Sequence, residues 1–489
     1  MSARSFFEKA SRPEQQQCRI LLLSYHFPPS IAVGARRWEQ FAHFIAERGW
    51  GLDVVMCHVG IGDSDDARMA TLPPGIRVYA VPQPVLVAER IEDRVWRAYR
   101  FVKPRRAPHL PSNTAGASGD RDRATTGRVS IYRTEMRWPP RTAREFLRFC
   151  GAAVISSREY AWARRAAAVA EQLAVPGVHR AIVSSGPPHM AHEGARLASV
   201  ATGLPLIVDM RDPWSLLPML HESIASPWWY SVARRREQQV VARASVVIAN
   251  TDPARAGLAA LYPDAAARMI TVLNGTDNYP LPPSRQGGRF TIGFAGTVYL
   301  GKDVRHLLLA AARVIHELAL TPADIGVDFI GEFGGPGELS ISALARDASI
   351  GEFVTVGPRR AHAAALEFLS QATMLVVFVG FGAMFIPAKT FEYMRFDAWL
   401  LTLTEPGSAT DQLLRDTDAD VVAPDDVPGI AAAIRRRYEL HRQGVTPVHI
   451  ARDERFSRAK QAAVLLDAIE RVFPQSAPRR DRSALATES

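Results

Sequence analysis

The chain has 489 residues, 47% of them hydrophobic and 22% charged, which predicts a globular protein with more than one hydrophobic core. Its formal net charge of +9 favours an anionic partner: nucleic acid, a phosphorylated small molecule or an acidic membrane face. Nucleic acid is the least favoured, because the sequence has no zinc-finger spacing, aromatic RNA-binding pattern or basic heptad helix. A surface of solvated arginines is the simpler explanation of the charge.

The apolar runs are shorter than the roughly 18 to 20 residues that a membrane span needs, so no transmembrane helix is expected. Residues 1–18 form a polar leader without the apolar core and cleavage site of a secretory signal. The cysteines, Cys18, Cys57 and Cys150, are widely spaced and form neither a metal-binding pattern nor a disulfide framework. A cytoplasmic protein is therefore expected.

The first predicted elements form a β-α-β unit. A buried strand at residues 19–24 precedes an amphipathic helix at 36–48 and a second strand at 52–57, which is typical of the start of a doubly wound sheet. Gly34 stands where this helix begins and would let a ligand approach the backbone closely. It is a lone glycine rather than part of a G-x-G-x-x-G pattern, so a dinucleotide site is not supported and a simple turn remains the alternative.

Between residues 83 and 144 the periodicity disappears, and the segment is rich in proline, glycine, serine and charge. This composition predicts a mobile insertion. Its arginines and aromatic residues offer a membrane-contacting surface as one interpretation, and an ordinary disordered insertion as the other.

After the insertion, helices and strands alternate again. Helices are predicted at 159–173, 190–202 and 227–244, and strands at 181–185, 206–209, 245–249 and 270–273. Polar residues follow several of these strands. Because ligands of doubly wound sheets bind at the carboxyl ends of the strands, the residues just after the strand ends are candidates for a site: His189, Asp209, Arg211, Asp212 and Trp214.

A proline- and glycine-rich segment at 279–289 marks a domain boundary. Strands are then predicted at 290–295, 327–330, 353–356, 374–379, 399–403 and near 421, with helices at 304–318, 339–348, 362–370, 427–443 and 456–472. The predicted organisation is a leader, a first domain at 19–280, a second domain at 281–455, a terminal helix at 456–475 and a disordered tail at 476–489.

Residues 378–408 predict strand, loop, helix and strand, with Lys389 and Glu392 near the start of the helix. Free N–H groups at the positive end of a helix suit an anion such as a phosphate, and Lys389 adds a full charge. Glu392 lies one turn later on the same face, where a carboxylate can accept hydrogen bonds from a sugar diol. The alternative is a surface helix with a weak exposed Lys-Glu pair.

Four segments together resemble glycosyltransferases of family four, whose GT-B fold has two Rossmann-like domains facing a central cleft. They are S-Y-H-F-P-P-S-I-A-V-G-A-R-R at 24–37, S-S-G-P-P-H at 184–189, D-M-R-D-P-W at 209–214 and I-P-A-K-T-F-E-Y at 386–393. The segments occur in the order and spacing of the family. The resemblance spans nearly the whole chain outside the insertion and the tail.

The resemblance implies that a nucleoside-diphosphate sugar lies against the second domain and its acceptor against the first. Glu392 would then bind the ribose, Lys302 and Lys389 would neutralise the diphosphate, and Gly34 would close over it. The resemblance implies an arrangement that needs no metal ion, so neither a metal ion nor another cofactor is expected beside the nucleotide sugar.

Two positions depart from the family pattern. Met384 replaces a Glu that contacts the donor sugar in many members, and Thr297 replaces an Arg among the donor-binding positions. These differences leave the identity of the donor sugar open.

On the acceptor side, His189 is a candidate to bind or polarise the acceptor, and Asp212 is expected to orient Arg211 through a bidentate pair. The structural alternative is a turn histidine and a buried pair that holds the loop. His26 and His192 are expected to be structural.

The function implied is a retaining glycosyltransferase that transfers a sugar to an acceptor hydroxyl in cell-surface polysaccharide or glycolipid assembly. It would act in the cytoplasm, in possible peripheral contact with an anionic membrane. Two alternatives stay open: a sugar-nucleotide epimerase of the same fold and a non-catalytic GT-B-like binding protein.

Overall fold

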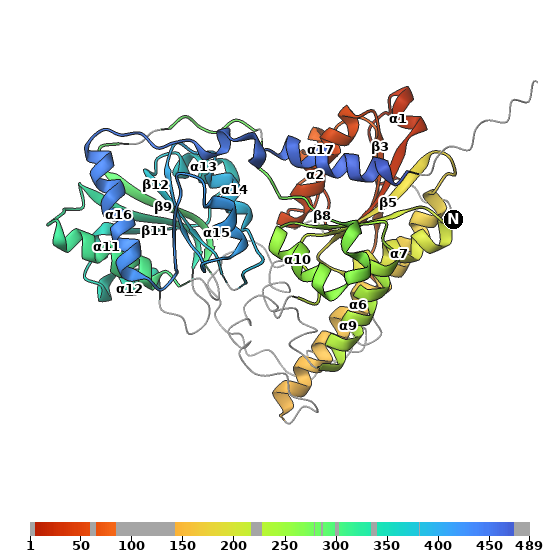
Figure 1. Cartoon of the computed structure of the whole chain (residues 1–489), viewed down its shortest axis with the longest axis horizontal. Coiled ribbons are helices and arrows are strands. Elements are labelled where there is room, and N and C mark those ends of the chain that lie inside the picture. The colour runs from red at the N-terminus through yellow and green to blue at the C-terminus, as the bar shows by residue number, and fades with distance from the viewer. Residues whose placement is uncertain are drawn as a thin grey trace, which may run out of the picture.

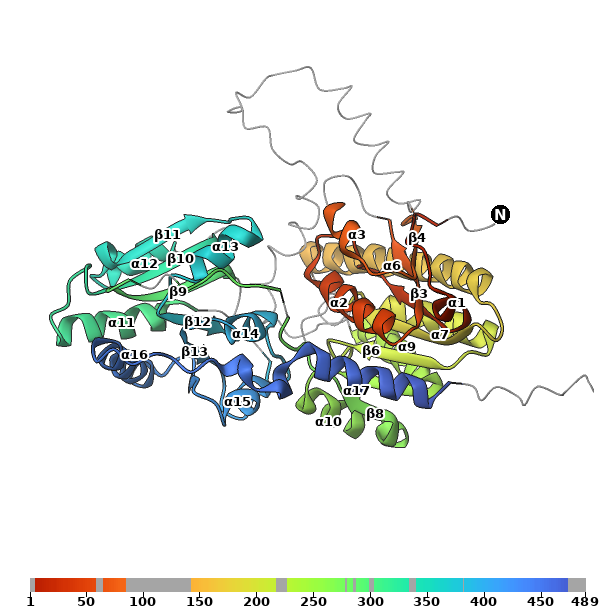
Figure 2. The same cartoon turned by 90° about the horizontal axis from the view of Figure 1, so that it is seen from above.

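A computed structural model of the chain shows two α/β domains, each built on a parallel sheet with helices on both faces (Figures 1 and 2). The structure describes residues 5–58, 65–84, 142–216, 227–277, 279–284, 287–298, 303–333, 340–380 and 382–473.

The first domain contains an eight-stranded sheet of order β1-β4-β3-β2-β5-β6-β7-β8, in which β1 pairs antiparallel and the other pairs are parallel. Its strands are β1 (Phe7–Glu8), β2 (Arg19–Ser24), β3 (Gly51–Cys57), β4 (Ile76–Val81), β5 (His179–Gly186), β6 (Leu206–Met210), β7 (Val246–Ala249) and β8 (Met269–Thr271). Its helices are α1 (Pro13–Gln17), α2 (Val33–Glu47), α3 (Ala67–Thr71), α6 (Ala143–Leu173), α7 (Met190–Thr202), α9 (Pro227–Arg243) and α10 (Asp252–Leu261).

Alternate residues of the central strands face opposite layers of helices. Leu21 and Leu23 of β2 join the core under α6, α7, α9 and α10, whereas Ile20 and Leu22 face α2. All four side chains are fully buried, which explains why this strand reads as a continuous apolar run.

The second domain contains a six-stranded parallel sheet of order β11-β10-β9-β12-β13-β14. Its strands are β9 (Phe290–Val298), β10 (Ile325–Phe333), β11 (Val354–Pro358), β12 (Met374–Phe378), β13 (Trp399–Leu403) and β14 (Asp420–Val422). Its helices are α11 (Arg305–Glu317), α12 (Ile341–Asp347), α13 (His362–Leu369), α14 (Ala388–Tyr393), α15 (Ala409–Leu414) and α16 (Val427–Arg442). Short 3-10 helices occur at Pro263–Arg268, Gly351–Phe353, Ile450–Arg452 and Glu454–Phe456.

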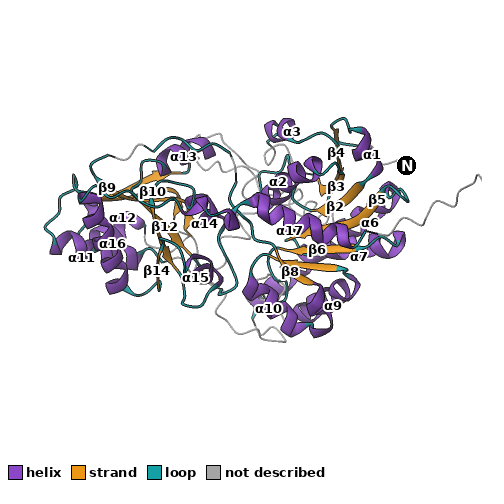
Figure 3. Ribbon diagram, turned by 45° about the horizontal axis from the view of Figure 1, so that its top comes forward, coloured by secondary structure: helices purple, strands orange, loops and turns teal. Residues whose placement is uncertain are grey.

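The C-terminal helix α17 (Arg458–Arg471) returns to the first domain (Figure 3). Its buried Leu465 and Ile469 share a core with Trp38 and Phe41 of α2. Thr276, in the linker that leaves the first domain, forms a parallel bridge with Ser457 at the start of α17. The two segments that connect the domains therefore lie side by side.

Among the parallel strands, the order of each sheet reverses once, between β2 and β5 in the first domain and between β9 and β12 in the second. The helices that follow the strands on the two sides of such a switch point lie on opposite faces of the sheet, which leaves a crevice at the carboxyl ends where ligands bind. The fold therefore provides one candidate binding edge in each domain.

The strands at 19–24 and 399–403 and the helix at 190–202 have the predicted bounds. The predicted helix start near residue 159 is wrong, because α6 begins at Ala143, within the predicted insertion. The predicted elements also missed β4 and α10. Residues 85–141, most of the predicted insertion, and the predicted tail lie outside the described residues.

None of the helices that the structure describes is both long enough and apolar enough to cross a membrane. The longest of them, α6, has 31 residues and carries arginines and glutamates along its length.

At the opposite edge of the first sheet, the starts of three strands share a buried polar cluster. Arg19 donates to both carboxylate oxygens of Asp53, at 2.9 and 2.6 Å. His179 accepts a hydrogen bond at Nδ1 from the Val175 N–H, so its Nε2 donates to Asp53 at 2.8 Å. Burial raises the pKa of Asp53, but the hydrogen bonds from His179 and Arg19 outweigh it and lower the pKa overall.

We predict that Asp53→Asn lowers the free energy of unfolding by about 3 to 5 kcal/mol, because it leaves the buried Arg19 charge without its partner. In the wild type this stabilisation is present above pH ~4 and is lost as the pH falls through the lowered pKa of the folded state. Denaturant unfolding at several pH values measures both effects.

The control is Asp467→Asn, which removes a carboxylate from an exposed pair with Arg48. It is expected to change the unfolding free energy by less than about 1 kcal/mol. Equal losses in the two variants would contradict a structural role for the buried cluster.

Candidate functional site

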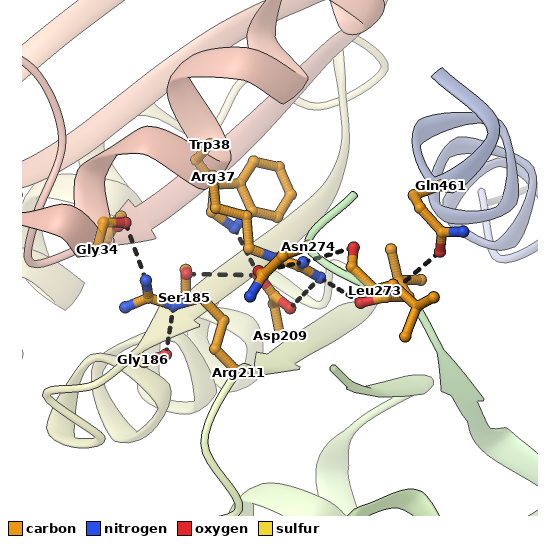
Figure 4. Close-up of polar contacts among 12 residues, drawn as sticks. Gly34, Arg37, Trp38, Ser185, Gly186, Asp209, Arg211, Leu273, Asn274 and Gln461 are labelled. Atoms are coloured by element: carbon orange, nitrogen blue, oxygen red, sulfur yellow. Dashed lines mark hydrogen bonds and ion pairs between the residues drawn. The ribbon is translucent and has the colours of Figure 1, made fainter. Parts of the chain in front are cut away.

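Arg211, which follows β6, connects three segments at the binding edge of the first domain. Its guanidinium donates to the backbone oxygens of Gly34 at 3.0 Å and Gly186 at 2.8 Å (Figure 4), and to that of Pro187 at 3.2 Å. These oxygens belong to the first turn of α2 and to the end of β5. Arg211 therefore holds together the loops on both sides of the switch point.

Gly34 is a glycine because Arg211 packs against it. A Cβ atom at position 34 would lie 2.9 Å from Nη2 of Arg211, too close without movement of the guanidinium. The sequence predicted Gly34 as a point of close approach for a ligand. In the structure the group that approaches is Arg211, and a contact with a diphosphate stays a prediction.

The expected bidentate pair between Asp212 and Arg211 is wrong. All the hydrogen bonds of the Arg211 guanidinium to described residues go to backbone carbonyls, because these carbonyls converge on it. The Asp212 carboxylate acts on Arg211 only as a nearby charge: burial lowers the pKa of Arg211, and Asp212 opposes that shift. The backbone oxygen of Asp212 accepts a hydrogen bond from His189.

His189 lies between the ends of β5 and β6. Its Nε2 is 2.9 Å from the backbone oxygen of Asp212. Its ring stacks on Trp214, with the ring centroids 5.2 Å apart and an angle of 11° between the ring planes. A carbonyl oxygen only accepts, so Nε2 carries the proton and donates it. In the neutral ring the proton-accepting nitrogen is therefore Nδ1.

His26 and His192 have the buried surroundings expected of structural histidines. Burial, together with the charge of Arg211, lowers the pKa of His26 to about 4. His192 is fully buried, and its Nδ1 lies 2.8 Å from Oγ of Ser184. Burial also lowers the pKa of His192, so both rings are neutral at pH 7.

In the second domain, Lys389 of α14 lies at the carboxyl end of β9. Its ammonium donates to the backbone oxygen of Ala295 and is 4.6 Å from the centroid of the Phe294 ring. A Cβ at Gly296 would overlap the ammonium, 1.4 Å away, so the glycine makes room for this charge. Thr297 is exposed at the same strand end, and Lys302 lies outside the described residues.

The start of helix α14 contributes less to anion binding than the sequence predicts. Helix α14 has only six residues, and Pro387 at its N-cap has no N–H to offer. Because the helix dipole is a sum over aligned peptide groups, so short a helix contributes little. Lys389 is therefore the main positive charge that α14 places at this edge.

Glu392 faces a group of residues that the sequence interpretation missed. Its Oε1 accepts a hydrogen bond from the Tyr279 hydroxyl at 2.8 Å and lies 3.7 Å from Nε2 of His362. Burial lowers the pKa of His362, and the positive charge of Arg36 lowers it further. Arg36 belongs to α2, so a charge of the first domain acts on this histidine of the second.

A second contact connects the domains through Met384. The Thr251 hydroxyl at the N-cap of α10 donates to the backbone oxygen of Met384 at 2.7 Å. A Cβ at Gly257 would lie 3.1 Å from Cε of Met384, so the methionine packs closely on α10. Met384, one of the two departures from the family-four pattern, therefore anchors a loop of the second domain on the first.

Sequence signals for the missed residues were weak. Tyr279 stands in a proline-rich linker, where composition predicts only a hinge, and His362 begins an ordinary amphipathic helix. Thr251, followed by Asp252 and Pro253, is a helix start signal that would have found α10.

The sequence matches no protein-family profile. It is 33% identical over 156 residues to D-inositol 3-phosphate glycosyltransferase 1 of Catenulispora acidiphila, a match that spans 29% of this chain and 37% of that protein. The similarity thus covers little more than a third of the length of this relative.

Solved structures of GT-B glycosyltransferases are similar over nearly the whole chain. The lipopolysaccharide outer core galactosyltransferase WaaB is 11% identical with a TM-score of 0.52, covering 93% of this chain and 99% of WaaB. Anabaena HepE in complex with UDP-glucose is 12% identical with a TM-score of 0.53 and the same coverage. TarM is 8% identical with a TM-score of 0.56, covering 94% of this chain and 100% of TarM. At these identities the likeness shows the GT-B fold.

We predict that Arg211→Lys lowers the free energy of unfolding by about 2 to 4 kcal/mol, because a single ammonium cannot replace a planar fork that reaches three carbonyls. Asp212→Asn is the comparison, and its expected cost is less than about 1 kcal/mol. Denaturant unfolding of both variants measures the difference. Similar losses would instead favour the Arg211–Asp212 pair.

Proposed function

We propose that the protein is a retaining glycosyltransferase of family four, which transfers a sugar from a nucleoside diphosphate to an acceptor hydroxyl. The observation that carries this proposal is the position of Lys389 and Glu392 on α14, beside the switch point of the second sheet in a GT-B fold. An ammonium and a carboxylate one helical turn apart match the two polar parts of a nucleoside diphosphate, its phosphates and its ribose.

The chemistry requires a positive charge at this place. Breaking the bond between the anomeric carbon and the diphosphate leaves negative charge on the departing nucleotide, and a fixed cation stabilises that charge in the transition state. In this proposal Lys389 supplies the cation, together with Lys302, without a metal ion. Gly296 leaves the ammonium space at the strand end, and Thr297 is exposed beside it.

The acceptor would lie against the first domain, near His189 and the loop that Arg211 holds. In this proposal His189 binds or polarises the acceptor. Arg211 and Asp212 would shape this side of the site rather than take part in proton transfer. The leaving phosphate would take the proton of the acceptor hydroxyl, with retention at the anomeric carbon.

We place this activity in cell-surface polysaccharide or glycolipid assembly in the cytoplasm. The name of WaaB, a lipopolysaccharide galactosyltransferase of the same fold, supports the class of acceptor. The net charge of +9 supports peripheral contact with an anionic membrane, where a lipid-linked acceptor would be found.

A non-catalytic GT-B-like binding protein is the second candidate, and Met384 favours it. A methionine has no carboxylate to offer a donor sugar. Its backbone and side chain instead dock on the first domain, at Thr251 and Gly257. Binding of nucleotide without turnover would distinguish this candidate from the transferase.

We predict that a nucleoside diphosphate raises the melting temperature of the protein, and that Lys389→Met lowers kcat/KM for turnover of the matching nucleotide sugar by about 100-fold or more. Thermal shift with UDP, GDP, ADP and CDP identifies the nucleotide. Release of that nucleotide from its sugar conjugates measures turnover.

The matched control is Lys460→Met, which removes an exposed charge on α17. It should leave both measurements unchanged within about twofold. Binding with no turnover in the wild type would favour the non-catalytic candidate, and no shift with any of the four nucleotides would refute the proposal.

For the membrane partner, we predict that the protein pellets with vesicles containing phosphatidylglycerol and remains in the supernatant with pure phosphatidylcholine. Binding should fall steeply between 0.1 and 0.5 M NaCl, as the Debye length shrinks from about 10 Å to a few Å. A variant without residues 85–141 tests the contribution of the insertion. Equal pelleting with both kinds of vesicle would argue against a charge-based contact.

A further inference from the structure

Tyr279 belongs to the linker between the sheets, yet its side chain lies against the second domain. Its hydroxyl donates to Oε1 of Glu392 at 2.8 Å. Burial raises the pKa of Tyr279, and the negative charge of Glu392 raises it further, so the hydroxyl keeps its proton at neutral pH. Tyr279 is therefore the donor and Glu392 the acceptor.

The tyrosine ring is itself held on two sides. The guanidinium carbon of Arg395, just beyond α14, lies 4.2 Å from the ring centroid, and Arg395 also donates to the backbone oxygen of Tyr279. The ring of His362 contacts the Tyr279 ring edge-on, with the centroids 5.8 Å apart and an angle of 74° between the ring planes. The hydroxyl thus approaches Glu392 from a fixed direction.

This contact determines which part of the Glu392 carboxylate remains available. The Glu392 side chain is 22% exposed, so it is neither free in solvent nor closed off from a ligand. With Oε1 held by the hydroxyl, the carboxylate cannot rotate freely, and its remaining lone pairs keep one orientation. Holding a binding group in place before the ligand arrives reduces the entropy lost on binding.

We propose that Tyr279 is a positioning residue for Glu392, and that through it the linker contributes to recognition of the ribose hydroxyls of the nucleotide. This inference rests on the proposed function, because it takes the ribose as the ligand of Glu392. It goes further by making ribose recognition depend on a residue outside both sheets. A movement of the linker that withdraws Tyr279 would weaken nucleotide binding, and bound nucleotide would in turn restrain the linker.

The test compares the affinity for UDP with that for 2′-deoxyUDP by calorimetry. If the four-nucleotide screen favours another base, the corresponding pair with and without the 2′-hydroxyl is used. The full-length wild type is expected to prefer the ribonucleotide by about tenfold or more, the value of one hydrogen bond to a charged group. Tyr279→Phe keeps the ring and its contacts with Arg395 and His362 but removes the hydroxyl.

In Tyr279→Phe we expect the preference for UDP to fall by about 3- to 10-fold, while the affinity for 2′-deoxyUDP stays within about twofold of the wild type. Glu392→Gln should abolish most of the preference. Adding Tyr279→Phe to Glu392→Gln should then cause no further loss, because the tyrosine acts through the carboxylate.

The matched control is Tyr438→Phe, which removes a phenol hydroxyl in the core of the second domain and should leave the preference unchanged. An unchanged preference in Tyr279→Phe, or an equal further loss in the double variant, would overturn the positioning role alone. If the wild type bound neither nucleotide, or both equally well, the ribose assignment of Glu392 and this inference would fail together.

Discussion

A buried ion pair between Arg37 and Asp209 determines where the parts of the candidate site lie. The two side chains are 3% and 0% exposed, and Arg37 donates to both oxygens of Asp209, at 3.0 and 3.1 Å. Trp38 donates to the same carboxylate at 2.8 Å. The first turns of α2 are thus fastened to the end of β6. Removal of either charge would leave the other buried without a partner, which is strongly destabilising.

The same arginine also fixes the start of the interdomain linker. It donates to the backbone oxygens of Val272 and Leu273, both at 3.0 Å, and to Oδ1 of Asn274 at 3.1 Å. The linker then passes Thr276, which pairs with the start of α17, and reaches Tyr279 beside Glu392. The linker is therefore held by hydrogen bonds to the core of the first domain at residues 272–274 and to Glu392 of the second domain at Tyr279.

The two domains use their polar residues differently. In the first domain Arg37, Asp209 and Arg211 hold loops in place, and the ring of His189 contacts the Asp212 carbonyl and stacks on Trp214. In the second domain Lys389 and Glu392 stand on one short helix at the sheet edge. The polar residues named at the strand ends of the first domain therefore make mainly structural contacts.

The sequence by itself determined the alternation of strands and helices, the two Rossmann-like domains, the placement of Lys389 near the start of a helix and that of His189 at a strand end. These features follow from local periodicity and from the rule that parallel strands end at a common edge. Only the tertiary structure decided that Arg211 binds carbonyls rather than Asp212, that Met384 docks on α10, and that Tyr279 donates a hydrogen bond to Glu392. The contacts of Met384 and Tyr279 join residues far apart in the chain, and Arg211 has several acceptors within reach. Which acceptor it binds depends on how the loops converge, and that convergence has no signature in the local sequence.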